Sequence, residues 1–178
     1  MIAFAVLALP VVGIPVGIGL TDYLRRRSEA EFVDILHRYD RAQSVYHSKD
    51  RDGDKKLEYC RRIGDLVGIE KSGGAGIADD ELLVTEELAA ARGRKGKPLR
   101  GYLFLEMSSI WKIPVNWEGD YAICAIPAEY GRTGTRTYIM KADGEVWWKD
   151  RGKAEFLRNY PRDREGNGWA LFEKKKDQ

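Results

Sequence analysis

The chain has 178 residues, of which 43% are hydrophobic and 33% charged, a composition that excludes wholesale disorder and suits one domain plus an anchor. Its 30 lysines and arginines nearly balance 28 aspartates and glutamates, and a net charge of +2 argues against a nucleic-acid-binding protein. Two cysteines, Cys60 and Cys124, are too few for a disulfide scaffold. They either pair in an oxidising compartment or are two small core residues.

The N-terminal segment is apolar, because residues 2–20 hold no charged residue and no polar side chain. As a helix this run is about 28 Å long, close to the hydrocarbon thickness of a bilayer. Tyr23 and the basic residues 25–27 follow it, as at a membrane interface. We predict a transmembrane anchor helix over residues 1–27 and a soluble domain over residues 28–178. The alternative, a cleaved signal peptide, needs a basic leader and a small-residue cleavage site, which do not flank this run.

Four residues of the anchor are the predicted assembly positions. Pro10 and Pro15 each remove a backbone hydrogen bond and kink a helix, whereas Gly13 and Gly17 form a Gly-x-x-x-Gly pair that lets two helices approach closely. We therefore expect homo-oligomers that form through the N-terminal helices. The basic residues 25–27 place the body in the cytoplasm by the positive-inside rule, but a basic leader removed before this N-terminus reverses that orientation.

Residues 28–47 have the periodicity of an amphipathic helix, with apolar side chains at steps of three and four residues. Ser28 and Glu31 form a capping box, so a new helix can begin there. One long helix that continues from the anchor is favoured, because no proline or glycine interrupts residues 21–31. His37 and His47 lie on this helix without the spacing of a metal site.

An acidic turn follows the helix and is the candidate metal site. The carboxylates of Asp50, Asp52, Asp54 and Glu58 can converge on a hard cation such as Ca²⁺. Counted from Asp50, however, the sixth and twelfth positions hold a lysine and an arginine where an EF-hand loop has glycine and glutamate. A solvated turn that ends the helix is therefore the favoured interpretation, and no cofactor is predicted.

Two short helices and a basic linker are predicted between residues 57 and 100. The helices are residues 57–66 and 81–91, and the glycine-rich loop between them lacks the lysine–serine ending of a phosphate loop. Residues 92–100 carry five basic side chains in a linker, which is either solvated or in contact with a phosphate surface.

The periodicity of the second half predicts strands. Four are expected, at residues 102–106, 121–126, 135–140 and 145–149. Asp143-Gly144 is a strong signal for a hairpin between the last two strands. The predicted fold class is α+β, with the long N-terminal helix, half membrane-anchored and half amphipathic, packed on a four-stranded antiparallel sheet. Trp147 and Trp148 must face opposite sides of their strand, so one of them lies away from the helix.

No catalytic constellation is recognisable in the sequence. It contains neither a Gly-x-Ser-x-Gly nucleophile elbow nor a His-Glu-x-x-His motif, and a Cys–His dyad depends on tertiary contacts. We therefore predict a protein without enzymatic activity. Its tryptophans can line a glycan site or an assembly surface; they are Trp111, Trp117, Trp147, Trp148 and Trp169.

The order of these features resembles the type IV pilins and the type II secretion pseudopilins. Residues 39–46 are similar to the aromatic- and glutamine-containing stretch of many pilin-like helices, and residues 82–91 with 101–104 to the segment before the first strand. The most specific likeness is the run over residues 125–138, followed by Asp143-Gly144, which resembles uncharacterised bacterial pilin-like proteins. The family's anchor also carries a glutamate, which residues 2–20 lack.

The resemblance implies a structural subunit of a pilin-like or pseudopilin-like filament that assembles with other pilin-like subunits through its apolar helix. It also implies a bacterial inner-membrane protein with its body in the periplasm, or a filament outside the cell. The missing glutamate fits a tip position or a non-assembling role. The alternative function is a membrane-anchored domain that binds glycans or lipid headgroups through the tryptophans and residues 92–100.

Overall fold

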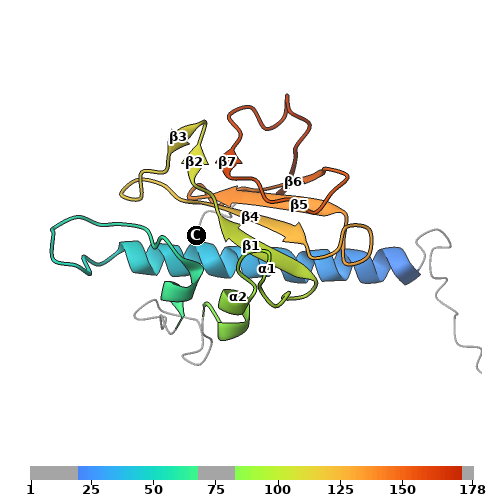
Figure 1. Ribbon diagram of the computed structural model, residues 1–178, viewed down its shortest axis with the longest axis horizontal. Coiled ribbons are helices and arrows are strands. Elements are labelled where there is room, and N and C mark those ends of the chain that lie inside the picture. Colours follow the sequence, from blue (N-terminus) through green and yellow to red (C-terminus); the bar gives the residue numbers. More distant parts are fainter. Residues whose placement is uncertain (1–19, 68–82, 174–178) are drawn as a thin grey trace, which may run out of the picture.

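The computed structural model describes residues 20–67 and 83–173, which form three layers (Figure 1). A long helix, α1 (Leu20–His47), lies on one face of a five-stranded sheet, and a smaller sheet lies on the other. The short helices are η1 (Ile63–Leu66) and α2 (Glu86–Ala90). The strands are β1 (Tyr102–Glu106), β2 (Ser109–Ile110), β3 (Ile113–Pro114), β4 (Ala122–Pro127), β5 (Arg136–Lys141), β6 (Val146–Asp150), β7 (Asn159–Tyr160) and β8 (Ala170–Glu173).

The larger sheet is antiparallel throughout, with the strand order β1-β4-β5-β6-β8. β5 and β6 are joined by the predicted Asp143-Gly144 turn, in which Gly144 takes a φ of 70° that a residue with a side chain rarely adopts. The smaller sheet has the order β3-β2-β7, where β2 pairs antiparallel with β3 and parallel with β7. The parallel pair is formed by segments about fifty residues apart in the chain.

Both faces of the larger sheet are covered, as its central strand β4 shows. All six residues of β4 are buried. Ile123 and Ala125 belong to the cluster of buried side chains on the α1 face, whereas Ala122, Cys124 and Ile126 belong to a second cluster on the opposite face. Because successive side chains of a strand point to opposite faces, an uninterrupted apolar strand needs a cover on both sides.

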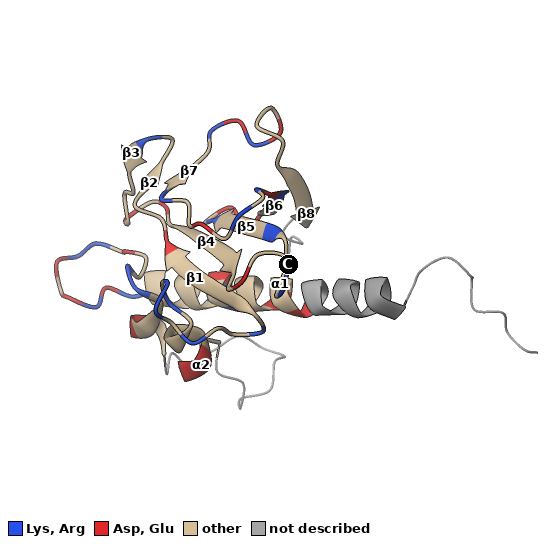
Figure 2. Ribbon diagram, turned by 45° about the vertical axis from the view of Figure 1, so that its right-hand side comes forward, with Lys and Arg blue, Asp and Glu red and all other residues tan. Residues whose placement is uncertain are grey.

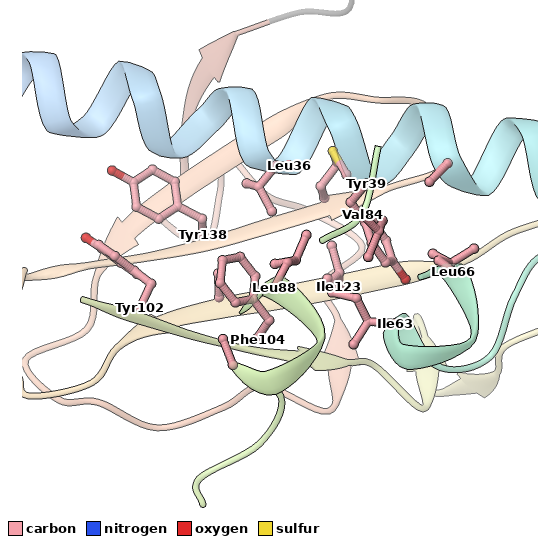
Figure 3. Packing of buried hydrophobic residues seen from close by; sticks show 14 of the residues in the cluster. Leu36, Tyr39, Ile63, Leu66, Val84, Leu88, Tyr102, Phe104, Ile123 and Tyr138 are labelled. Carbon is pink, nitrogen blue, oxygen red and sulfur yellow. The ribbon is translucent and has the colours of Figure 1, made fainter. Parts of the chain in front are cut away.

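The cluster on the α1 face joins the helix to the sheet and to the short helices (Figure 3). The Phe32 ring of α1 packs against the rings of Tyr102 and Tyr138, with centroid distances of 4.2 and 4.7 Å. Leu36 and Tyr39 follow at helical spacing and are 1% exposed. Buried side chains from η1 and α2 complete this cluster, among them Ile63, Leu66 and Leu88.

Polar side chains also connect the segments on this face. Gln43 of α1 accepts a hydrogen bond from the Cys60 amide at 2.8 Å and donates one to the Cys60 carbonyl at 2.9 Å. The Tyr121 hydroxyl donates to the buried Asp40 carboxylate at 2.6 Å. These bonds pair polar groups that would otherwise be buried without partners.

The cluster on the opposite face lies under β2, β7 and the C-terminal segment. Its large members are Met107, Trp147, Tyr160 and Trp169, all buried. Trp148, the neighbour of Trp147, packs against the cluster on the α1 face. The prediction that one of the two adjacent tryptophans lies away from the helix is therefore confirmed.

The predicted fold class is wrong. In place of a half-apolar helix on one four-stranded sheet, the described chain has two sheets, of five and three strands. The fifth strand, β8, and the strand β7 come from the charged C-terminal segment, where no regular alternation marks them. The smaller sheet is built of two-residue strands, which are too short to produce a periodicity in the sequence.

The predicted transmembrane and pilin-like character, with its inner-membrane, periplasmic or extracellular filament location, is also wrong. None of the helices within residues 20–67 and 83–173 is long and apolar enough to cross a membrane, because charged residues recur along the whole of α1. The assembly positions Pro10, Gly13, Pro15 and Gly17 lie outside the described residues.

Candidate functional site

The acidic turn after α1 brings three of its four predicted carboxylates together. Carboxylate oxygens of Asp50, Asp52 and Asp54 lie within 4.8 Å of one another, and all three residues are exposed. The two Asp50 oxygens accept backbone hydrogen bonds from Gly53 at 2.7 Å and Lys55 at 2.9 Å. These two bonds lower the pKa of Asp50. The convergence of the carboxylates is thus explained by the closing of the turn.

Glu58, the fourth predicted ligand, takes no part in this group. It accepts a hydrogen bond from the Arg61 guanidinium at 3.2 Å. Lys56 of the same turn donates to Glu118 at 2.6 Å and ties the turn to the loop before β4. Among the described residues no further histidine, cysteine, aspartate or glutamate joins these three exposed aspartates.

The two cysteines lie on opposite faces of the larger sheet, so they do not form the disulfide that the sequence left open. Both are free and buried, Cys60 in the cluster on the α1 face and Cys124 in the opposite one. The Cys60 thiol donates to the Arg62 carbonyl at 3.1 Å. Burial raises the pKa of Cys60 to about 11 and that of Cys124 to about 12. Neither thiol therefore has the lowered pKa of a catalytic nucleophile.

The histidines contribute to packing. His47, at the end of α1, stacks on Tyr59 with a centroid distance of 4.2 Å. Its Nε2 lies 3.0 Å from the Glu118 carbonyl oxygen. His37 is half-buried on the same helix, ten residues earlier. The partners given for His47 are thus Tyr59 and Glu118, and the Cys60 and Cys124 sulfur atoms bond to backbone groups of Arg62 and Leu157.

Most of the basic linker has a structural role. Arg92 forms an ion pair with Glu106 at 2.8 Å, and Arg100 forms one with Glu31 at 2.8 Å. Arg94 donates to the Ala154 carbonyl at 2.9 Å. These three arginines hold the linker against α1, β1 and the C-terminal segment, although all five basic residues of the linker are exposed.

The hairpin of β2 and β3 has unusual residues in its turn. Trp111 and Lys112 form its two-residue loop, with φ values of 55° and 66°. Two-residue hairpin loops with positive φ at both positions strongly favour Asn-Gly. A residue with a bulky side chain is strained in this region by about 1 kcal/mol or more.

Hydrogen bonds to β7 hold this turn in place. The Trp111 amide donates to the Tyr160 carbonyl at 2.9 Å, and the Lys112 amide donates to the Asn159 side chain at 2.5 Å. Ile110 is 8% exposed and anchors the hairpin in the cluster away from α1. The strained conformation therefore persists because the hydrogen bonds to β7 and the burial of Ile110 fix the backbone of the turn.

The turn and β3 present apolar side chains to solvent. Trp111 is 47% exposed and Ile113 is 64% exposed. Lys112 and Pro114 are exposed as well, and the Arg162 guanidinium lies 5.9 Å from the centre of the Trp111 ring. We call Trp111, Lys112, Ile113 and Pro114 the hairpin tip. In Figures 1 and 2 it lies on the side of the larger sheet opposite α1.

Trp111 differs from the other four tryptophans, all of which are buried or half-buried. The two other exposed large hydrophobic residues of the described chain, Leu57 and Tyr130, lie singly on other loops. In the sequence, Trp111 stands out only as one of five tryptophans. The hairpin cannot be recognised there, because the segment from Ser109 to Pro114 has no glycine or asparagine to mark a turn.

A family model matches part of the chain. The family described as "protein of unknown function (DUF2950)" matches residues 111–160, which is less than half of the chain. The matched segment begins at Trp111 of the hairpin tip and ends with β7. No solved structure matches the chain.

Proposed function

We propose that this chain is a non-enzymatic interaction protein, a binding or structural subunit, whose contact element is the hairpin tip. The observation that carries the proposal is the pair of large apolar side chains, Trp111 and Ile113, exposed on one tight turn. Surface hydrophobic residues scattered singly are ordinary, whereas contiguous exposed apolar side chains are candidates for a contact site.

The strain in the turn supports this proposal. An Asn-Gly turn at residues 111 and 112 would relieve it. Trp111 is 47% exposed and belongs to neither of the two clusters of buried side chains. Strain that persists without a gain in packing is characteristic of functional positions.

The buried polar groups support a non-enzymatic role. The side chains of Gln43 and Glu106 each accept a hydrogen bond from a backbone amide. The Asp40 carboxylate accepts one from the Tyr121 hydroxyl, and Glu106 also pairs with Arg92. Each bond joins two segments of the chain, which is a structural task. The thiols have raised pKa values, which suits core residues better than nucleophiles.

The experiment is a gradient sedimentation of gently prepared extract from the native cells, with the full chain followed by antibody. Three forms are compared: wild type, the double variant Trp111→Ser/Ile113→Ser, and Leu57→Ser. The control residue Leu57 is 45% exposed on the acidic turn and matches Trp111 in exposure.

We expect the wild type and Leu57→Ser to migrate in a large complex and the double variant to migrate as the free chain. A double variant that sediments with the wild type would contradict the proposal. A wild-type chain that already migrates alone would contradict it too.

A further inference from the structure

We infer that the surface bound by the hairpin tip is the anionic headgroup layer of a lipid bilayer, reached by peripheral contact. This inference rests on the proposed function, since it names the partner of the same tip. It concerns only the hairpin tip, with its exposed Trp111 and Ile113, and assigns no membrane-spanning segment.

The chemistry of the tip matches a bilayer interface. Tryptophan is enriched at the boundary between headgroups and hydrocarbon, because its ring is apolar and its N–H is polar. Ile113 adds an aliphatic side chain that is 64% exposed. Lys112 in the turn and Arg162 beside the indole supply cations at the same place. Cations at this depth are attracted to the negative surface potential of an anionic membrane.

The carboxylate nearest in sequence to Arg162 is directed into its own loop. Asp163 accepts a hydrogen bond from the Gly166 amide at 2.8 Å, and its carbonyl accepts one from the Asn167 side chain. The hairpin also stands clear of the acidic turn at the end of α1 (Figure 2). Among the ion pairs of the described residues, none involves Lys112 or Arg162, so the cations of the tip keep their positive charge uncompensated by a neighbouring carboxylate.

The size of the tip favours a bilayer over a protein partner. A standard protein interface buries about 800 Å² on each partner and involves 20 to 30 residues. The hairpin tip has only four exposed residues. The other exposed large apolar residues of the described chain, Leu57 and Tyr130, lie on other loops. A bilayer needs no matching shape, so a small convex projection can insert into it.

The tip is also poorly suited to a glycan. A sugar stacks on an open aromatic face and needs hydrogen-bonding side chains around it. Here the Arg162 guanidinium lies over the Trp111 ring, and the adjoining exposed side chain, Ile113, is aliphatic. The arrangement of apolar end and cationic flank fits phosphate headgroups above hydrocarbon.

The test is flotation of the purified full chain with vesicles of phosphatidylcholine alone and with vesicles containing 30% phosphatidylglycerol, at low and high salt. The variants are Trp111→Ser/Ile113→Ser, Lys112→Gln/Arg162→Gln and the control Leu57→Ser. All keep residues 1–27, so any lipid affinity of the apolar run at residues 2–20 is common to every sample.

We expect binding to the anionic vesicles to be at least tenfold stronger than to the neutral ones and to weaken in high salt. Each double variant should lose about tenfold in affinity, while Leu57→Ser binds as the wild type does. The variant Trp111→Asn/Lys112→Gly, whose turn suits the hairpin better, should fold and also lose binding, which separates lost contact from lost folding.

Equal binding to both vesicle types, or unchanged binding by the tip variants, would overturn the inference. Absence of lipid binding, with the large complex still lost in Trp111→Ser/Ile113→Ser, would overturn it in favour of a protein partner and leave the proposed function standing. If Trp111→Ser/Ile113→Ser loses neither lipid binding nor the large complex, both the inference and the proposed function are overturned.

Discussion

At the scale of single residues, Glu106 joins three segments of the fold. Its side chain is 5% exposed and accepts hydrogen bonds from the Ile63 amide at 2.6 Å and from the Arg92 guanidinium at 2.8 Å. Through it, strand β1 holds both the start of η1 and the turn after α2. A buried carboxylate of this kind is stable only while its donors are in place.

Glu106→Gln should therefore lower the free energy of unfolding by about 2 kcal/mol, because the charge-assisted bonds to Ile63 and Arg92 weaken. Urea denaturation followed by circular dichroism measures it. Glu129→Gln is the matched control, since Glu129 and its partner Arg132 are 58% and 79% exposed and an exposed pair contributes little. Equal losses in the two variants would refute the structural role given to Glu106.

The buried thiols give a second prediction. Because burial raises the pKa of Cys124 to about 12, the folded chain holds this proton more tightly than the unfolded chain does. The resulting stability is fully present below the ordinary thiol pKa of about 8.5 and is lost as the pH rises above it. Thermal unfolding between pH 7 and 10 should show a steeper decline for the wild type than for Cys124→Ala.

The same thiols should be unreactive in the folded chain. Ellman's reagent at pH 8 should modify neither Cys60 nor Cys124 until denaturant is added, when both react. Rapid modification of the native chain, or a disulfide between the two in non-reducing mass spectrometry, would contradict their burial on opposite faces of the sheet.

At the scale of elements, the β2–β3 hairpin combines strain and exposure. Its turn residues Trp111 and Lys112 hold positive φ values, and hydrogen bonds to β7 maintain them. The strain arises because residues with bulky side chains take positive φ values at these two positions. Residues that adopt positive φ readily should therefore relieve it without a change of the backbone conformation.

Trp111→Asn/Lys112→Gly should consequently raise the free energy of unfolding by about 1 kcal/mol. Urea denaturation of the variant beside the wild type measures this gain. The variant should bind less, so stability and binding move in opposite directions. A variant that is less stable than the wild type would show that Trp111 serves the fold.

How well an element could be predicted depended on its length. The predicted strand at residues 102–106 coincides with β1, and those at 121–126, 135–140 and 145–149 are each one residue from β4, β5 and β6. These runs are long enough to show apolar and β-branched residues between turn signals. The predicted helix at 57–66 shrinks to η1, because the Cys60 backbone bonds to Gln43 and not within a helix.

The hairpin tip and β7 were not predictable in this way. β2 and β7 pair in parallel across about fifty residues, a contact that leaves no local pattern. The turn residues were hidden because Trp and Lys replace the usual Asn-Gly. Of the predicted metal ligands, three aspartates converge through local turn geometry, whereas Glu58 is drawn to Arg61.

At the scale of the whole molecule, the two faces of the larger sheet have different roles. Its α1 face is filled by aromatic and aliphatic packing, which fixes the helix and the short helices. Its other face carries the smaller sheet and the C-terminal segment, from which the hairpin tip projects. The uninterrupted apolar sequence of β4 is typical of a strand covered on both sides, a signal that the prediction of a single covered face did not use.

The most direct test of the hairpin tip as the contact element is hydroxyl-radical footprinting read by mass spectrometry. The purified chain is compared with the same chain in freshly prepared native extract, residue by residue. We predict that Trp111 and Ile113 are oxidised in the purified chain and protected in the extract, while Tyr130 and Leu57 are oxidised equally in both. Equal oxidation of Trp111 and Ile113 in the two samples, with protection elsewhere, would contradict the account.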